Sequence, residues 1–226
     1  MLHKRKGRVF REICEKRKGV EMKPKITLLH HTPLEVCSHA IRTCWSSFDK
    51  SDCGGEKDRE LINRVGNIFN HKSTLEHLQY SFFIQGISRA TLQELSRHRI
   101  ASYSVKSSRY TLAELKRADI STLELASKFI KLTNNDKVNQ ASHKALQNLK
   151  ELLLDSSTTN DVAKYAMPEC YLTELTWTIN ARSLQNFLTL RTSKHALWEI
   201  QELARAIYEA LPQEHKYLFE KCVEVE

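Results

Sequence analysis

The sequence predicts a single α+β domain. Segments with the two-residue alternation of strands are interspersed with segments of helical apolar spacing along the 226 residues. No stretch rich in glycine, serine or proline divides the chain, and the 41% of hydrophobic residues suffices for a full core. We therefore expect one folded domain at residues 24–226, preceded by a basic arm at residues 1–23.

Local patterns in the first half predict two strands and two helices. The second strand alternates on one face through Leu78, Tyr80, Phe82 and Ile84. A glycine pair among charged residues marks a loop at 50–58. The elements are a strand at 26–32, a helix at 33–45 with Pro33 near its first turn, a helix at 59–71 with Leu61, Val65 and Ile68 on one side, and a strand at 75–88.

The second half adds one strand and two helices. A long helix at 136–156 carries an apolar stripe that indicates core packing. Its members are Val138, Ala141, Ala145, Leu149 and Leu152. The remaining elements are a strand at 173–180, which alternates through Leu175, Trp177 and Ile179, and an amphipathic helix at 195–211.

The net charge of +8 is uneven along the chain. Residues 1–21 contain eight Lys/Arg against three Glu, a net +5, which leaves 8 − 5 = +3 for the remainder. Three interpretations of this arm are open. It binds polyphosphate loosely, it is a solvated tail, or it is an extension upstream of a true translation start at Met22. Because the charge lies mostly in the arm and no nucleic-acid-binding motif is present, we expect no specific nucleic-acid partner.

Several absences indicate a soluble cytoplasmic protein. No run of about 18 apolar residues is available to span a membrane. The N-terminus is charged throughout and lacks the apolar region of a secretory signal. The six cysteines show neither a C-x-x-C pair nor a zinc-like histidine spacing, so we expect reduced thiols and no metal site.

Residues 87–99 and 179–191 share a pattern. Each segment follows a strand, starts a helix at a hydroxyl residue and places an arginine seven residues after its first leucine. The candidate helix caps are Thr91, in a capping box with Glu94, and Ser183. Arg99 and Arg191 are then expected on the leucine side of their helices, where a buried guanidinium needs an anionic partner. An acidic side chain and a bound anion are both candidates for that partner.

The segment at 97–110 concentrates cations and hydroxyl groups and contains no acid. Arg97, His98 and Arg99 are consecutive, so on a helix they fan out over about 200°, and at a helix end they can bracket a flat or anionic ligand. A serine hydroxyl, backbone N–H groups and an arginine two residues further on are the donors that a phosphate monoester requires. Ser107 and Arg109 have that spacing. The alternative is a solvated basic turn.

Arg97-His98-Arg99, then seven residues and Ser107, resembles the RHR-x7-S signature of the flavin-dependent thymidylate synthases. The resemblance extends to HKSTLEH at 71–77 and to 177–201, and spans roughly residues 24–212. It implies a central, mostly antiparallel sheet flanked by helices. It also implies FAD-dependent reductive methylation of dUMP to dTMP, with 5,10-methylenetetrahydrofolate as carbon donor and NADPH as reductant. The family builds its sites between the subunits of a homotetramer.

The resemblance assigns roles to individual residues. The implied flavin contacts are His71, Ser73, Glu76, Arg97, His98, Arg99, Asn180, Arg182, Asn186 and Ser47. The implied contacts of the uracil nucleotide are Ser107, Ser108, Arg109, Lys164, Glu94 and Arg191. Arg191 is the catalytic candidate, because an arginine at the uracil ring stabilises negative charge that develops on its oxygens and N3. The cations of residues 97–99 would offset the negative charge of a reduced flavin.

Some positions depart from the family pattern. Lys164 stands where an arginine is common, and an ammonium is a point charge in place of a fork. Glu94 stands where a glutamine can contact dUMP, and Val105 and Lys106 replace a commoner acidic-Leu pair. Cys170 is a conceivable nucleophile, although the flavin-dependent family needs none and a buried thiol is the simpler interpretation. A nucleic-acid-binding module and a non-catalytic nucleotide-binding protein are the competing function classes.

Overall fold

The centre of the fold is a four-stranded antiparallel sheet with the order β1-β2-β4-β3. The computed structural model describes residues 23–224 of the chain. The strands are β1 (Lys25–His31), β2 (Gln79–Ser88), β3 (Ala101–Val105) and β4 (Leu172–Asn180). The expected α+β class and antiparallel sheet are confirmed, whereas β3 was not predicted. Its alternate residues are exposed serines, and the strand is held by pairing with β4 and by Tyr103, whose ring lies 6.3 Å from that of Trp177.

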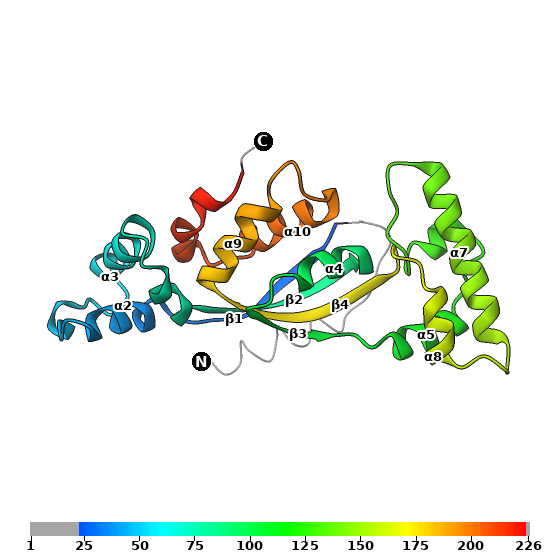
Figure 1. The fold of residues 1–226 in the computed structure, drawn as a ribbon, viewed down its shortest axis with the longest axis horizontal. Helices are drawn as coiled ribbons and strands as arrows, with labels where there is room; N and C mark the ends of the chain where they lie inside the picture. The colour runs from blue at the N-terminus through cyan, green and yellow to red at the C-terminus, as the bar shows by residue number, and fades with distance from the viewer. Residues whose placement is uncertain (1–22, 225–226) are drawn as a thin grey trace, which may run out of the picture.

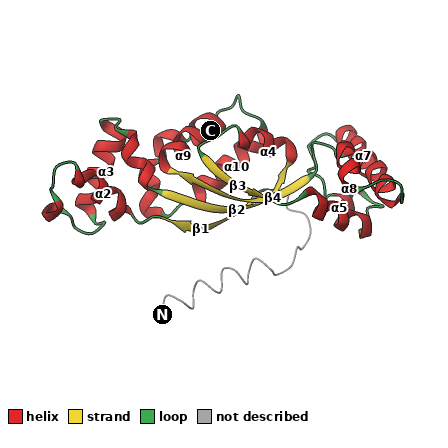
Figure 2. Ribbon diagram, turned by 60° about the horizontal axis from the view of Figure 1, so that its bottom comes forward, coloured by secondary structure: helices red, strands yellow, loops and turns green. Residues whose placement is uncertain are grey.

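Helices cover one face of the sheet and extend beyond both of its ends, as Figures 1 and 2 show. The covering helices are α4 (Arg89–Ser96), α9 (Ala181–Arg191) and α10 (Trp198–Glu209). At one end lie α2 (Leu34–Thr43) and α3 (Glu56–Ile62). At the other end lie α5 (Ser108–Arg117), α6 (Leu123–Ala126), α7 (Asp136–Leu154) and α8 (Asn160–Ala163). Within residues 23–224, none of the helices combines the length and the apolar character needed to cross a bilayer.

Short helical turns complete the described part of the chain. The 3-10 turns are Phe48–Lys50, Lys72–His77, Lys164–Ala166, Gln213–Leu218 and Glu220–Cys222. Asn63–Ile68 forms a wider π turn directly after α3. This widening turns Ile68 outward, to 66% exposure, so the predicted apolar face of the helix at 59–71 is wrong at that residue.

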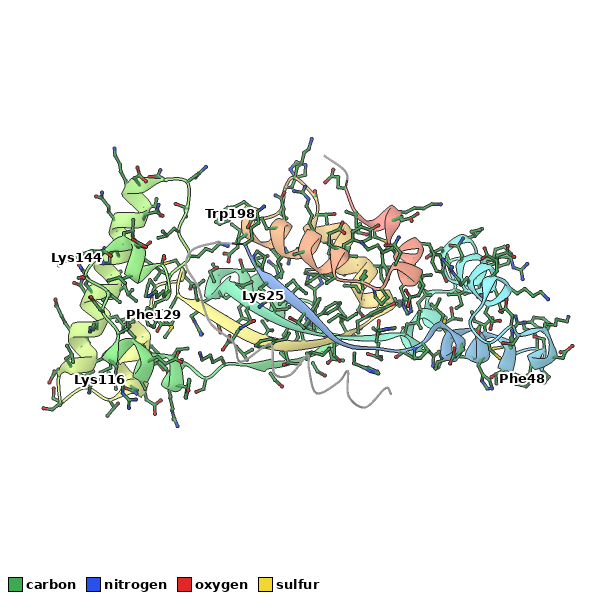
Figure 3. The ribbon with its side chains drawn as sticks, turned by 180° about the vertical axis from the view of Figure 1, so that it is seen from behind. Lys25, Phe48, Lys116, Phe129, Lys144 and Trp198 are labelled. Carbon is green, nitrogen blue, oxygen red and sulfur yellow. The ribbon has the colours of Figure 1, made fainter. Side chains whose placement is uncertain are left out.

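The buried apolar residues form two separate clusters. The larger cluster lies between the sheet and its covering helices and includes Phe82, Trp177 and Phe187. The smaller cluster joins α5 to α8 and includes Leu146 and Tyr171. Figure 3 shows how far the molecule extends, with Phe48 and Lys144 at opposite ends. The lobe formed by α5 to α8, residues 108–163, therefore has packing of its own beyond the end of the sheet.

The apolar stripe predicted for α7 is partly wrong. The residues that α7 buries are Asn139, Leu146, Leu149 and Leu153. Val138, Ala141 and Leu152 are exposed. Asn139 explains the shift, because its Oδ1 accepts from the Thr133 N–H at 2.7 Å and its Nδ2 donates to the Thr133 carbonyl at 2.9 Å. A hydrogen-bonded amide is thus buried at the position next to Val138, the residue that was expected to be buried.

The two similar strand-helix units begin earlier than predicted. Ser88 caps α4 by accepting from the Thr91 N–H at 3.1 Å, and Asn180 caps α9 by accepting from the Ser183 N–H at 2.8 Å. The expected capping box of Thr91 with Glu94 and the cap at Ser183 are therefore wrong. Each helix starts where its strand ends, so the last strand residue supplies the cap. The Glu94 side chain lies in the second turn of α4 and is available for another contact.

Candidate active site

The C-terminal ends of α4 and α9 meet over the sheet. Ser88 at the end of β2 is paired with Leu172 at the start of β4, and Asn180 at the end of β4 is paired with Gln79. The two following helices therefore start from opposite ends of neighbouring strands and run toward each other (Figure 1). Arg191 and Glu94, 97 residues apart in the sequence, meet there through Nη1 and Oε2 at 2.7 Å.

A cleft of about 1260 Å³ opens beside this junction. Its lining contains many of the residues that sequence reasoning assigned to the flavin or the substrate: Glu76, Arg97, His98, Arg99, Arg182, Asn186 and Arg191. They come from the turn at 72–77, from the segment after α4 and from α9. The cleft is rich in guanidinium groups, so it is suited to a large ligand with negative charge.

Three acceptors hold the Arg191 guanidinium. Nη1 donates to the Glu94 carboxylate at 2.7 Å, Nη2 donates to the Glu94 carbonyl at 3.1 Å, and Nε donates to His98 Nε2 at 3.1 Å. The anionic partner expected for Arg191 is thus an acidic side chain in this structure. Three of the five N–H groups of a guanidinium are engaged in these bonds, and two are left for a ligand.

His98 points into the protein, whereas Arg97 and Arg99 on either side are exposed. Its ring meets Phe187 edge-on at 5.1 Å. Burial, reinforced by the charge of Arg191, lowers the pKa of His98 to about 4. The neutral imidazole is therefore favoured at physiological pH in this structure, so the positive charge of the segment comes from its two arginines.

The exposed guanidinium groups are only partly neutralised. Arg97 lies 3.7 Å from the Glu94 carboxylate, and Arg182 donates to Glu76 at 2.8 Å. Helix α4 ends at Ser96, so Arg99 follows the helix and is not on its buried side as predicted. The positive groups of residues 97–99 that face the cleft are accordingly Arg97 and Arg99.

Four further residues expected at the flavin lie around the cleft or apart from it. His71 and Ser73 are exposed on the turn that also contributes Glu76 to the cleft. The Asn180 side chain is engaged as the cap of α9. Ser47 lies in the connection between α2 and α3, where its carbonyl accepts from Arg42 at 3.4 Å.

The residues expected at the substrate phosphate lie on the lobe of α5 to α8. Ser107 is the N-cap residue of α5, and its side chain makes no capping bond. Ser108 is in the first turn of the same helix, and the exposed Lys164 follows α8. The Arg109 fork binds Asp161 of α8 through two bonds of 2.7 Å. None of them lines the cleft at Arg191, and Figure 1 shows the lobe beyond the end of the sheet.

Sequence reasoning missed several residues of the cleft wall. Lys72, Ser193 and His195 line the cleft beside the predicted residues. Their closeness in sequence to predicted site residues could have indicated them. Lys72 lies between two predicted flavin contacts, and the other two residues follow Arg191 by a few positions. Cys170, the conceivable nucleophile, is half-buried, and burial raises the pKa of its thiol. This supports a packing role for Cys170.

Acidification is expected to destabilise the fold through two buried histidines. Burial lowers the pKa of His98 and of His215 to about 4. Because an unfolded histidine has a pKa of about 6.5, the unfolded state binds more protons below that pH. The free energy of unfolding should therefore fall between about pH 6.5 and 4, by up to about 3 kcal/mol per histidine.

Urea midpoints measured at several pH values between 7 and 5 test this expectation. His215→Gln should reduce the pH dependence, because His215 is 1% exposed and is bonded to the Tyr80 hydroxyl at 2.8 Å. The matched control is His195→Gln, since His195 is exposed. A wild-type midpoint that does not change from pH 7 to 5 would show that the buried histidines do not govern acid stability.

Comparison with known proteins identifies the family. The model of the family described as thymidylate synthase complementing protein matches residues 27–215. The flavin-dependent thymidylate synthase of Campylobacter jejuni is 63% identical over 202 residues, which are 88% of this chain and 97% of that protein. The chain belongs to the flavin-dependent thymidylate synthase family.

Other members of the flavin-dependent thymidylate synthase family agree with this assignment. The Wolinella succinogenes enzyme is 64% identical over 197 residues, which are 86% of this chain and 96% of that protein. A crystal structure of the Helicobacter pylori enzyme, described as complexed with FAD and dUMP, is 59% identical and has a TM-score of 0.85. That likeness covers 88% of this chain and 100% of the other. The family expected from the RHR signature is confirmed.

Proposed function

We propose that this flavin-dependent thymidylate synthase converts dUMP to dTMP with FAD as cofactor, 5,10-methylenetetrahydrofolate as carbon donor and NADPH as reductant. The observation that carries the proposal is the Arg191 junction, where an arginine with two N–H groups still available borders the cleft. The Helicobacter pylori relative, described as complexed with FAD and dUMP, supports the same ligands here. We place the reaction in the cytoplasm.

The residues of the cleft suit a flavin dinucleotide. Arg97, Arg99 and Arg182 provide cationic donors for a diphosphate and for a reduced isoalloxazine ring, and Asn186 provides both a donor and an acceptor. When bound, FAD supplies hydride chemistry that no side chain can provide. We include His71, Ser73, Glu76, Asn180 and Ser47 in the proposed cofactor site, with Asn180 acting through its cap of α9.

Arg191 is the proposed catalytic residue. As C5 of uracil becomes nucleophilic, negative charge accumulates on the ring oxygens and N3. The guanidinium is held before the substrate arrives, so little reorganisation is required when that charge develops. Glu94, bonded to Arg191 through its carboxylate and its carbonyl, borders the same position and is proposed to contact the substrate.

The lobe of α5 to α8 is proposed to bind the substrate phosphate. The N-terminus of α5 offers free N–H groups beside Ser107, whose hydroxyl is not used as a cap, and Ser108. Arg109 would share its fork between Asp161 and the phosphate, and Lys164 would add a point charge. Because this lobe lies away from the cleft of its own chain, we propose a homotetramer in which a neighbouring subunit completes each site.

Replacing Ser107 by alanine is expected to raise the KM for dUMP. A hydrogen bond to a charged group contributes about 1.5–3 kcal/mol, which corresponds to an increase of roughly 10- to 150-fold. Steady-state kinetics with varied dUMP provides the measurement. Ser121→Ala, at an exposed serine of the same lobe, is the matched control. A KM equal to that of the control would exclude Ser107 from the phosphate site.

Product formation tests the proposed function. The purified protein is incubated with FAD, NADPH, methylenetetrahydrofolate and dUMP, and dTMP is separated and quantified. We expect dTMP only when all components are present. A protein that binds dUMP and forms no dTMP under these conditions would instead be a non-catalytic nucleotide-binding protein. Binding to nucleic acid that weakens steeply with rising salt would indicate a nucleic-acid-binding module.

A further inference from the structure

Lys106 lies at the junction between the sheet and the lobe of α5 to α8. It directly follows β3, and only Ser107 separates it from α5 (Figure 1). Its Nζ lies 3.0 Å from Glu114 Oε2 on α5 and 3.3 Å from Glu174 Oε1 on β4. One ammonium group thus contacts a carboxylate of the lobe and a carboxylate of the sheet.

The surroundings of Lys106 distinguish these ion pairs from ordinary surface pairs. The Lys106 side chain is 15% exposed, and its ammonium lies 5.2 Å from the centre of the Tyr110 ring. The Lys106 N–H also donates to the Glu174 carbonyl at 2.9 Å, which continues the pairing of β3 with β4 by one residue. Partly buried charges are screened by salt less than exposed ones. The backbone and the side chain of Lys106 are therefore both fixed against β4.

The two carboxylates belong to rigid elements. Gln85 Nε2 of β2 donates to Glu174 Oε2 at 3.0 Å, so the sheet side of the contact is held across two strands. Glu114 lies in the second turn of α5, the helix whose first residues are Ser108 and Arg109. A movement of α5 relative to the sheet must therefore break the contact of Lys106 with one of the two carboxylates.

We propose that Lys106 is a positioning residue that fixes the start of α5 against the sheet and thereby sets the affinity for dUMP. The inference rests on the proposed phosphate site at Ser107, the next residue, whose side chain makes no capping bond. A binding group that is held in place before the ligand arrives loses less conformational entropy on binding. Lys106 departs from the family pattern at its position, so this contact is a feature of chains that carry the lysine.

Direct binding of the phosphate by Lys106 is the competing role, and it gives the opposite expectation for Glu114. If Lys106 acts through Glu114, then Glu114→Gln should weaken dUMP binding, because the contact with the lobe is lost. If the ammonium binds the phosphate itself, Glu114→Gln removes a competing carboxylate and should leave binding unchanged or stronger. Lys106→Met removes the ammonium at similar length, and Lys106→Arg keeps a cation that can reach both carboxylates.

Affinity, catalysis and folding are measured separately. Calorimetry gives the dUMP dissociation constant of the FAD-loaded protein, flavin fluorescence gives the FAD dissociation constant, and steady-state kinetics gives kcat. Thermal unfolding checks that each variant is folded. Lys116→Met and Glu124→Gln, at exposed residues of the same lobe, are the matched controls for the loss of each charge.

The positioning role predicts the same loss when either partner is removed. Lys106→Met and Glu114→Gln should each weaken dUMP binding about 5- to 10-fold, whereas Lys106→Arg should stay within about threefold of the wild type. The double variant should bind dUMP no more weakly than Lys106→Met alone, because both substitutions break one contact. The kcat at saturating dUMP and the FAD dissociation constant should be unchanged, because Lys106 does not line the cleft.

Unchanged dUMP affinity in Lys106→Met, or a loss in Lys106→Met without a loss in Glu114→Gln, would overturn the inference. Hydrogen exchange tests the contact without a ligand. The amides of residues 110–114, which are bonded in the first turns of α5, should exchange faster in Lys106→Met than in Lys116→Met. Equal exchange would also overturn the inference, and Glu114→Gln is used for both measurements if Lys106→Met does not fold. A wild-type protein that forms no dTMP would instead refute the proposed function, and the exchange result would still show whether Lys106 holds α5.

Discussion

Arg191→Ala is expected to abolish thymidylate formation while FAD remains bound. The guanidinium is the group placed to stabilise negative charge on the uracil ring, and removal of one preorganised donor of this kind typically costs about 100- to 1000-fold in kcat. FAD should remain because Arg97, Arg99 and Arg182 line the cleft separately from the three bonds of Arg191. The measurements are dTMP turnover and the flavin absorbance of the purified variant.

Arg191→Lys is the matched control for this variant. It keeps a positive charge near Glu94 but cannot bond to three acceptors in one plane as the guanidinium does. We expect turnover well below that of the wild type, because the geometry matters as much as the charge. Normal turnover in Arg191→Ala would contradict the catalytic assignment. Loss of bound FAD from that variant would move the residue into the cofactor site.

Asp58→Asn is expected to cause the largest loss of stability, about 3–5 kcal/mol, because it leaves a buried arginine without a counter-charge. Asp58 Oδ1 accepts from Arg42 Nε at 3.1 Å and from Nη2 at 2.6 Å, and the side chains are 0% and 6% exposed. Burial by itself would raise the pKa of Asp58, yet the bonds from Ser51, Arg42 and Gly54 outweigh it and lower that pKa to about 2. Thermal and urea unfolding measure the loss.

The chain contains a matched control for the buried pair. Asp161 binds Arg109 through the same kind of two-bond fork, but the Arg109 side chain is 71% exposed and that of Asp161 48%. Asp161→Asn should leave the unfolding transition nearly unchanged, because exposed ion pairs contribute little. The double variant Arg42→Met with Asp58→Asn removes both buried charges and should be less destabilised than the sum of its single variants. Equal effects of Asp58→Asn and Asp161→Asn would contradict the role assigned to burial.

Local patterns in the sequence predicted the elements that carry the site. The alternation of Leu175, Trp177 and Ile179 predicted β4, and all three are buried. The repeated pattern predicted that two helices each follow a strand, and α4 follows β2 as α9 follows β4. The RHR-x7-S signature identified the family, because three consecutive basic side chains followed at a fixed spacing by a serine rarely arise from core packing. These features depend on short stretches of chain, which a sequence records directly.

The contacts around Arg191 could not be predicted from local pattern. The Glu94 partner exists because β2 and β4 are antiparallel neighbours, which brings together helix ends 97 residues apart. The inward direction of His98 depends on where α4 ends, and the helical pattern was expected to continue to Arg99, whereas α4 ends at Ser96. The predicted basic arm at residues 1–23 lies almost wholly outside the described residues, so its role stays a prediction.

A visible absorption spectrum of the protein loaded with FAD tests the central claim most directly. The spectrum is recorded first alone, then after anaerobic addition of NADPH, and then in a parallel sample after addition of dUMP. We expect a retained flavin that bleaches with NADPH and whose spectrum shifts with dUMP, because the cofactor and the uracil ring would share the cleft at Arg191. A protein that retains no flavin and does not respond to dUMP would contradict it.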